Sequence, residues 1–151
     1  MEQHQVNFLQ PAKLEKDLLR NSGAISVIEG CDSNGCEYMT GGTVIILGEV
    51  GDNFAAGMTG GMAFIYDKLK EFEKKVNPES VIWQNVETEY WINFLKKLVL
   101  EYSKETGSIL SKNIITNFEE EIKNFVQVCP KEMINKLKNP ITLKSKIKEV
   151  S

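Results

Sequence analysis

The sequence predicts a mainly β domain with added α-helices. Short parallel strands stack one above another, as in a β-helix or solenoid, ahead of two or three capping helices. Three observations predict this fold class. Ten of the eleven glycines lie between Gly23 and Gly61. The sequence MTGG occurs at 39–42 and again at 58–61, within a longer repeat. Apolar residues at helical spacing dominate the second half, from about residue 86 onward.

Each unit of the repeat contains one short strand. Apolar runs follow glycines at matching positions, at 24–28, 43–47 and 62–66. Runs rich in Val, Ile, Thr and aromatic residues, bounded by glycine, are typical of strands. A unit of about 19 residues is too short for a βαβ crossover, which takes about 30 residues, so equivalent strands are expected to stack in parallel.

The same repeat predicts which side chains share a face, because side chains alternate along a strand. Asn34 and Asn53 occupy equivalent positions of the repeat. Two stacks on one face are predicted from residues one repeat apart: Ile25 with Val44 and Ala63, and Val27 with Ile46 and Ile65.

The glycine-rich positions are expected to have a structural role, in sharp turns and in close contacts between successive rungs. The residues assigned this role are Gly23, Gly41, Gly42, Gly48, Gly51, Asn53, Gly57, Gly60, Gly61 and Glu37. Glu37 is expected to accept a hydrogen bond from backbone N–H groups of a tight turn. Nucleotide binding is the alternative. A Walker loop needs Lys after its last glycine, which no glycine here has, and a dinucleotide fingerprint needs glycines before a helix rather than before strands.

Charge divides the chain near Asp67, since residues 1–67 carry a net charge of −6 and residues 68–151 one of +3. Together with the apolar patterns, this predicts five segments: an N-terminal extension at 1–20, Gly-rich rungs at 21–67, a linker at 68–85, capping helices at 86–138 and a tail at 139–151. Residues 21–138 are expected to act as one domain.

The second half predicts helices packed on the rungs. Asn85 is a suitable N-cap, an apolar stripe runs from Trp91 to Tyr102, and Gly107 is suited to end the helix. A second helix is expected at about 109–127, and a third at 131–138 after Pro130.

Composition excludes several classes of protein. The net charge of −3 over 151 residues creates no field that favours nucleic acid. No apolar run approaches the length of about 18 residues that a membrane span needs, and the N-terminus does not resemble a signal peptide. Three cysteines are too few for a disulfide framework, which favours a reducing, cytoplasmic location.

No residue is expected to catalyse a reaction or to bind a metal or cofactor. Cys31 and Cys36 form a single close pair, whereas structural zinc sites use two close pairs. His4 is the only histidine and lies near the terminus, so a Ser–His–Asp triad is disfavoured. The carboxylates of the Gly-rich half lie at predicted corners, where solvated acids are ordinary: Glu29, Glu37, Asp52 and Asp67.

The stretch from Asn21 to Asp67 resembles the C-terminal domain of the glutamate synthase large subunit. The resemblance rests on NSGA at 21–24, GCEYMTGG at 35–42 and NFAAGMTGG at 53–61, and continues to about Pro130. It implies a right-handed parallel β-helix that acts as a non-catalytic scaffold between a glutaminase domain and a flavin domain. It also implies that FMN and the iron–sulfur clusters belong to other domains, in an enzyme that makes two glutamates from glutamine, 2-oxoglutarate and reductant.

Two alternatives stay open. One is a β-helix interaction subunit of another redox complex, similar to the Gly-rich subunit of formylmethanofuran dehydrogenase, and the other is a small-molecule-binding module. A solenoid with two or three rungs exposes strand edges unless something covers them. The expected partners are therefore the remaining glutaminase and flavin domains, or a second copy bound through the open end of the β-helix.

Overall fold

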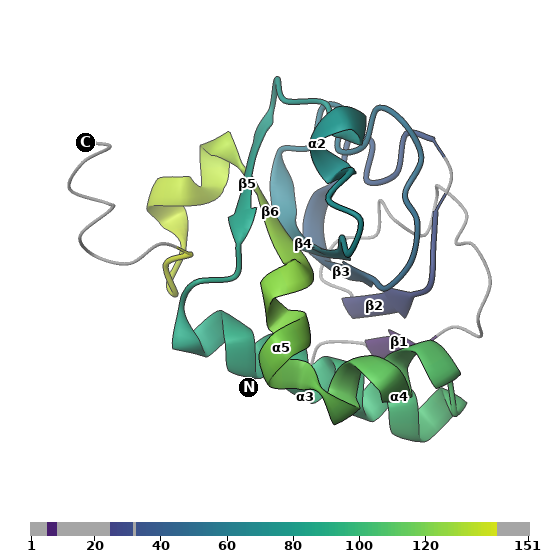
Figure 1. The fold of residues 1–151 in the computed structure, drawn as a ribbon. Helices are drawn as coiled ribbons and strands as arrows, with labels where there is room; N and C mark the ends of the chain where they lie inside the picture. The colour runs from purple at the N-terminus through teal and green to yellow at the C-terminus, as the bar shows by residue number, and fades with distance from the viewer. Residues whose placement is uncertain (1–5, 9–24, 32, 142–151) are drawn as a thin grey trace.

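The computed structural model describes residues 6–8, 25–31 and 33–141, and they form a mixed α/β fold (Figure 1). The strands are β1 (Val6–Phe8), β2 (Ile25–Ile28), β3 (Thr40–Ile46), β4 (Gly60–Tyr66), β5 (Val81–Asn85) and β6 (Phe125–Pro130). The helices are α2 (Phe72–Lys75), α3 (Glu89–Thr106), α4 (Ile109–Thr116) and α5 (Phe118–Glu121), with 3₁₀ segments at Ile122–Asn124 and Lys131–Lys136.

The strands form one six-stranded sheet in the order β1-β2-β3-β4-β6-β5. The first four strands are parallel neighbours, as the repeat predicted for β2, β3 and β4. β1 lies in the segment predicted as an N-terminal extension. β6 pairs antiparallel with both β4 and β5. The parallel run is therefore continued on the β4 side by two strands from the second half of the chain.

The predicted register is right for β3 and β4 but wrong for β2. Val44 pairs with Ala63 and Ile46 with Ile65, one full repeat apart. In contrast, Ile25 pairs with Thr43 and not with Val44, so the offset between β2 and β3 is one residue shorter than the repeat. Cys31 and Val50 are again a full repeat apart, because the turn after β3 contains one residue more than the turn after β2.

A shift of one residue turns every side chain to the other face of a strand. Ile25 and Val27 accordingly join the buried cluster of Ile45 and Phe64, not that of Ile46. The predicted stacks of Ile25 with Val44 and Ala63, and of Val27 with Ile46 and Ile65, are thus wrong in their first members.

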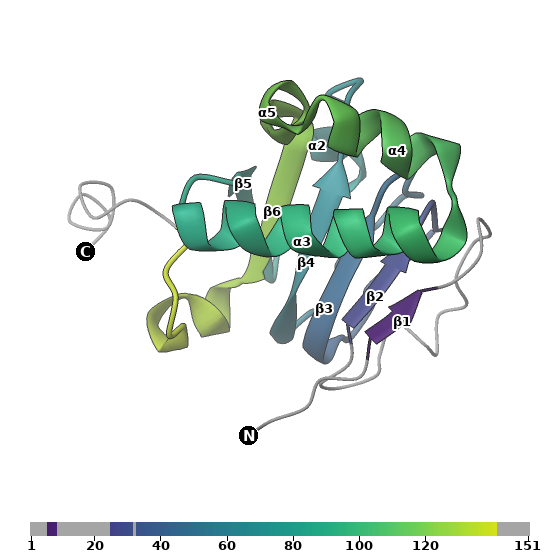
Figure 2. The ribbon, with the colours of Figure 1, turned by 90° about the horizontal axis from the view of Figure 1, so that it is seen from below.

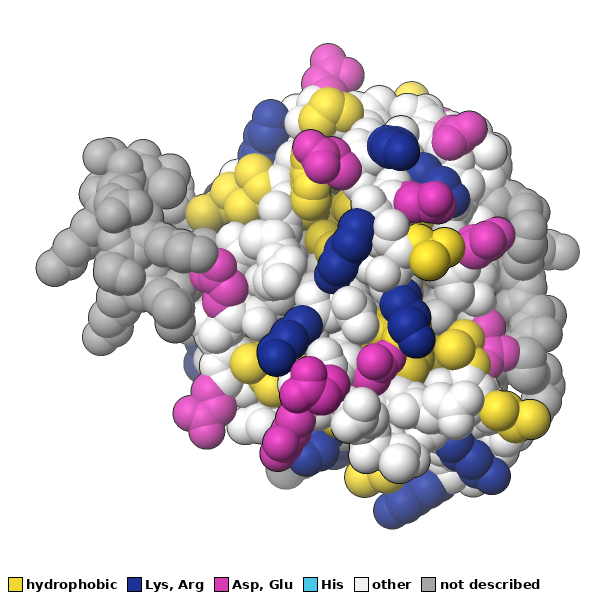
Figure 3. Space-filling view, viewed as in Figure 1, with side chains coloured by type: hydrophobic (Ala, Val, Ile, Leu, Met, Phe, Trp, Pro, Cys, Tyr) yellow, Lys and Arg dark blue, Asp and Glu magenta, His cyan; other side chains and the backbone are white. Residues whose placement is uncertain are grey.

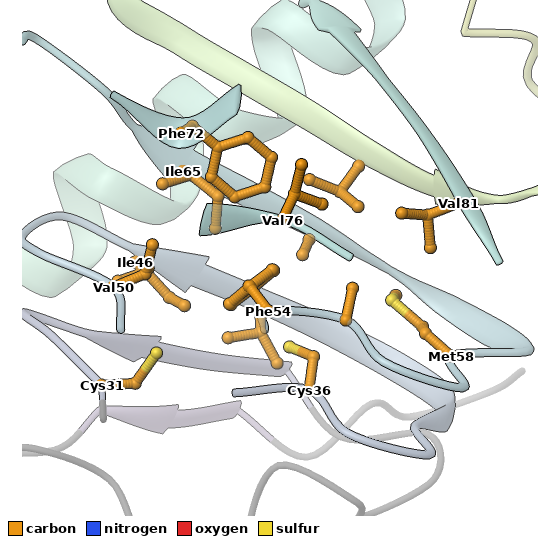
Figure 4. Packing of buried hydrophobic residues seen from close by; sticks show 14 of the residues in the cluster. Cys31, Cys36, Ile46, Val50, Phe54, Met58, Ile65, Phe72, Val76 and Val81 are labelled. Atoms are coloured by element: carbon orange, nitrogen blue, oxygen red, sulfur yellow. The ribbon is translucent and has the colours of Figure 1, made fainter. Parts of the chain in front are cut away.

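The sheet separates two buried clusters. The first lies between β2–β4 and the turns that connect them, and contains Ile46, Phe54, Ile65 and Phe72 (Figure 4). The second lies on the opposite face of the sheet, under the helices. Figure 2 shows α3, α4 and α5 lying across this face. There Phe64 packs against Trp91 and Phe94 of α3, with ring centroids 5.8 and 6.0 Å apart.

The helices therefore cover a face of the sheet, whereas the prediction placed them at the end of the stack. Beside β4 the stack is continued by β6, whose six residues are all buried. Phe125, Val126 and Val128 suit a strand that is buried on both faces. The predicted second helix at 109–127 is correspondingly wrong: it breaks at Asn117 and ends before this strand.

Other boundaries also differ. The segment 68–85, predicted as a linker, contains α2 and β5. Asn85 ends β5 and is not an N-cap; Thr88 occupies the N-cap of α3. Gly107 ends α3 in the left-handed conformation, with φ of 68°, as predicted. The predicted third helix is a 3₁₀ segment, and residues 142–151 of the predicted tail lie outside the described part of the chain.

Candidate functional site

Two successive turns, at 31–39 and 50–58, follow the same path and stack on each other. Residues one repeat apart share positive φ angles: 64° and 58° at Asn34 and Asn53, 57° and 65° at Cys36 and Ala55, and 56° and 65° at Tyr38 and Gly57. Backbone bonds of 2.8 Å join the turns, among them Asn34 N–H to the Asp52 carbonyl and Ala55 N–H to the Gly35 carbonyl. The two turns therefore repeat one backbone conformation, at the same spacing as the paired residues Val44–Ala63 and Ile46–Ile65 of β3 and β4.

Three asparagine side chains form a ladder across these turns. The Asn53 amide donates to Oδ1 of Asn34 over 2.8 Å, and the Asn77 amide donates to Oδ1 of Asn53 over 2.8 Å. At one end of the ladder, Oδ1 of Asn77 accepts the N–H of Glu79 over 3.0 Å. The equivalence of Asn34 and Asn53 was visible in the sequence; Asn77 was missed because it lies 24 residues after Asn53, outside the repeat.

Several glycines lie where neighbouring rungs leave no room for a side chain. A Cβ on Gly60 would lie 2.0 Å from the Thr40 carbonyl oxygen, and one on Gly48 would lie 1.8 Å from that of Glu29. At Gly57 the obstacle is the Tyr38 ring, 2.4 Å away. Backbone contact therefore requires glycine at Gly48 and Gly60, whereas at Gly57 the exposed Tyr38 ring can turn aside and the φ of 65° is what favours glycine.

The remaining assigned positions are placed as follows. Gly41 and Gly42 lie within β3, and Gly42 and Gly61 have φ of 83° and 85°. Gly51 N–H donates to the Cys31 carbonyl over 3.1 Å. Gly23 lies outside the described residues. Glu37 is half-buried in the turn at 31–39, and its bond to backbone N–H groups stays a prediction.

Two of the other corner carboxylates hold structure together. Glu29, at the end of β2, accepts a hydrogen bond from the Ser108 hydroxyl, which also accepts Ser111 N–H at the start of α4. Asp67, after β4, accepts the N–H groups of Glu71 and Phe72 at 3.0–3.2 Å. Burial raises the pKa of the nearby Tyr102 hydroxyl, and the charge of Glu29 raises it further. A hydrogen bond with Thr106 lowers the same pKa but does not cancel the rise.

The three cysteines are free thiols, and all three are buried. Cys31 and Cys36 lie in the first of the two buried clusters (Figure 4). Burial, and after it the proximity of Cys31, raises the pKa of Cys36 far above its usual value. Burial raises the pKa of Cys129 to about 11. Among the described residues, no three His, Cys, Asp or Glu side chains gather into a group that could hold a metal ion.

A largely apolar hollow of about 210 Å³ lies where β3 and β4 end. Its lining includes Leu47, Ile65, Leu69, Phe72 and Leu110. A volume this size is below the usual range of about 300–1,000 Å³ for small-molecule sites. Acidic and basic side chains are interspersed over the face seen in Figure 3, without a patch of one sign.

The GXGXG motif family matches residues 7–131. The chain belongs to this family. It is 51% identical over 129 residues to the NADPH glutamate synthase large chain of Azospirillum brasilense, covering 85% of the chain and 8% of that protein. It is 44% identical over 125 residues to the NADH glutamate synthase of Schizosaccharomyces pombe, covering 83% of the chain and 6% of that protein.

A chloroplastic ferredoxin-dependent glutamate synthase of Spinacia oleracea is 42% identical over 123 residues, 82% of the chain and 8% of that protein. The chain thus spans 6–8% of the length of these relatives. The resemblance drawn from NSGA, GCEYMTGG and NFAAGMTGG is confirmed. The stacked turns at 31–39 and 50–58 and the asparagine ladder lie within the part that the GXGXG family covers. In the described part of the chain, no helix has the length and apolar character needed to cross a membrane.

Proposed function

We propose that this GXGXG domain is a non-catalytic scaffold within a glutamate synthase. The observation that carries the proposal is its 39–51% identity to segments of glutamate synthases that differ in reductant, NADH, NADPH or ferredoxin. A segment shared by enzymes with different electron donors is suited to a task that all of them need. The geometry supports this: the carboxylates of Glu29 and Asp67 are engaged in holding turns, and the thiols are buried.

The rungs are proposed to form a short right-handed parallel β-helix, with residues 21–138 as one domain. Repeated positive φ angles, backbone bonds between turns, and strand pairs one repeat apart support a coil that repeats its path. In this proposal the glycines of the turns and strands have a structural task, which the backbone contacts at Gly48, Gly60 and Gly61 support: Gly41, Gly42, Gly48, Gly51, Gly57, Gly60 and Gly61.

The partners in this proposal are the glutaminase and flavin domains of the same enzyme. FMN and iron–sulfur clusters, in the cytoplasmic enzyme that converts glutamine and 2-oxoglutarate into two glutamates, are assigned to those other parts. β1 and β5 are the two terminal strands of the sheet, and β1 is the one that continues the parallel run of β2, β3 and β4. Terminal strands are able to pair with further strands, so the β1 end of the parallel run is the proposed docking side, for those domains or for a second copy.

A pull-down tests the proposal. The tagged chain is captured from its native cells, and co-purifying polypeptides are identified by mass spectrometry. Glutaminase and flavin-domain sequences, on separate chains or on one longer chain, are expected. Recovery of the folded chain without either would contradict the scaffold role and turn attention to the hollow beside Leu69 as a small-molecule site.

A further inference from the structure

Three consecutive backbone carbonyls near the end of the described chain accept hydrogen bonds from three side chains. Trp91 Nε1 donates to Asn139 over 2.9 Å, Thr88 Oγ1 to Pro140 over 3.2 Å, and Gln84 Nε2 to Ile141 over 2.6 Å. The donors come from β5 and from the start of α3. Residues 139–141 are hereafter called the strap, and the surface carrying Gln84, Thr88 and Trp91 is called the donor surface.

The orientation of the Thr88 hydroxyl links the donor surface to the strap. Thr88 is the N-cap residue of α3, where a threonine side chain normally accepts a hydrogen bond from the first turn of its own helix. Thr88 makes no such cap bond, and its hydroxyl donates to Pro140 instead. The Thr88 hydroxyl is therefore directed at the strap and makes no bond with the first turn of its own helix.

An aliphatic side chain anchors the strap. Ile141 is 2% exposed and belongs to the buried cluster under α3. Leu137, just before the strap, packs against the same cluster while remaining half-buried. Between them, Asn139 is half-buried and Pro140 is exposed, so the strap contributes its main chain and one fully buried side chain.

The donors recognise the main chain without regard to side-chain identity. Carbonyls are present in any extended segment, and within the described residues the strap makes no backbone–backbone hydrogen bond outside regular elements. Specificity must come from the position filled by Ile141. The three donors lie inside the part matched by the GXGXG family, which ends at residue 131, whereas the strap follows it.

We propose that the donor surface is a peptide-binding site and that the strap is its tethered ligand. The class of ligand is an extended peptide that presents three successive carbonyls and an aliphatic side chain on the last of the three residues. This inference concerns a site on α3 and β5, away from the β1 end of the sheet, and stands independently of the scaffold role.

NMR of the indole N–H groups in the full chain tests the proposal, because the chain has two tryptophans, Trp83 and Trp91. Trp91→Phe assigns the two signals. Ile141→Ala is expected to speed solvent exchange of the Trp91 indole at least tenfold while leaving Trp83 unchanged. Ile134→Ala, at a residue 37% exposed, is the matched control and should leave both signals unchanged.

The capped peptide KLKNPI, with the sequence of residues 136–141, is then added to the Ile141→Ala chain. The peptide should return the solvent exchange of the Trp91 indole to its slow rate, whereas KLKNPA should need at least a tenfold higher concentration for the same effect. An unchanged exchange rate of the Trp91 indole in Ile141→Ala, or equal binding of the two peptides, would overturn the proposal.

A second measurement covers the case in which Ile141→Ala does not fold. In the unmodified chain, the Trp91 indole should exchange faster than the backbone N–H of Ile45, in the middle of the sheet, because the strap opens without global unfolding. Equal exchange rates would make the strap an inseparable part of the core and would refute a tethered ligand.

Discussion

Replacing Gly60 by alanine tests whether close approach of successive rungs, and not flexibility, requires glycine. Gly60 is buried and lies opposite Thr40 at the start of β4. An alanine Cβ would lie 2.0 Å from the Thr40 carbonyl oxygen and 2.6 Å from the Thr40 carbonyl carbon. Both atoms are backbone, so no side-chain rotation relieves the contact.

The magnitude follows from what must move. Separating the two backbones by about 1 Å or more, the order of distance needed for ordinary contact, disturbs the bonds of Thr59 and Gly60 N–H to the Met39 carbonyl, at 2.9 and 3.2 Å. Each bond contributes about 1 kcal/mol, and overpacking costs about 1–3 kcal/mol. The expected loss is therefore about 3–5 kcal/mol, a large part of the total of about 5–15 kcal/mol typical of native proteins.

Gly107→Ala is the matched control. Gly107 has φ of 68°, but a Cβ there would meet no atom within 4 Å, so only left-handed strain of about 1–2 kcal/mol is expected. Urea unfolding followed by circular dichroism measures both variants, with slopes of about 1–3 kcal/mol/M. Gly60→Ala should lower the midpoint at least about 1.5 times as far as Gly107→Ala, from the two ranges above. Equal shifts would refute the rung-contact argument.

Three further predictions concern the ladder, the corner at Glu29 and the thiols. Asn53→Gly should cost about 1 kcal/mol from lost ladder bonds, and Asn53→Ala about 1 kcal/mol more because φ is 58°; unfolding curves in which Asn53→Gly matches the parent would contradict the ladder's contribution. Ser108→Ala should cost about 2 kcal/mol through loss of the α4 cap and the bond to Glu29, with Ser108→Thr losing less; equal midpoints for the two variants would argue against the hydroxyl. Folding holds the Cys129 thiol protonated by raising its pKa to about 11, so its contribution is complete below the unfolded pKa of about 8.5 and is lost as pH rises toward 11. The urea midpoint should thus fall between pH 8.5 and 11 less steeply in Cys129→Ala than in the parent, and parallel pH profiles would count against this explanation.

The parallel strands and stacked turns were predictable because local chemistry repeats there. MTGG and the paired asparagines recur at one and the same spacing, and the structure pairs β3 with β4 at that spacing. The slip of β2 was not predictable, since a single additional residue in the turn after Ile46 leaves the apolar pattern intact while exchanging the faces.

The second half was harder to predict because tertiary contacts decide its structure. Residues 125–127 continue an apolar pattern compatible with a helix, but pairing of β6 with β4 and β5 makes them a strand. At the candidate site, Asn77 joins the ladder from outside the repeat. The donors Gln84, Thr88 and Trp91 meet the strap from positions 48 to 57 earlier in the sequence. No local sequence pattern predicts either of these two contacts. A strand with all six residues buried, as in β6, lacks the alternation that distinguishes strands from helices.

Size-exclusion chromatography with light scattering tests the scaffold role most directly. The chain is measured over a range of concentrations, alone and mixed with the glutaminase and flavin-domain polypeptides of the same enzyme. The account predicts one complex that contains both polypeptides and this chain, or self-association of the chain when it is alone. A concentration-independent monomer that elutes apart from both polypeptides would contradict it.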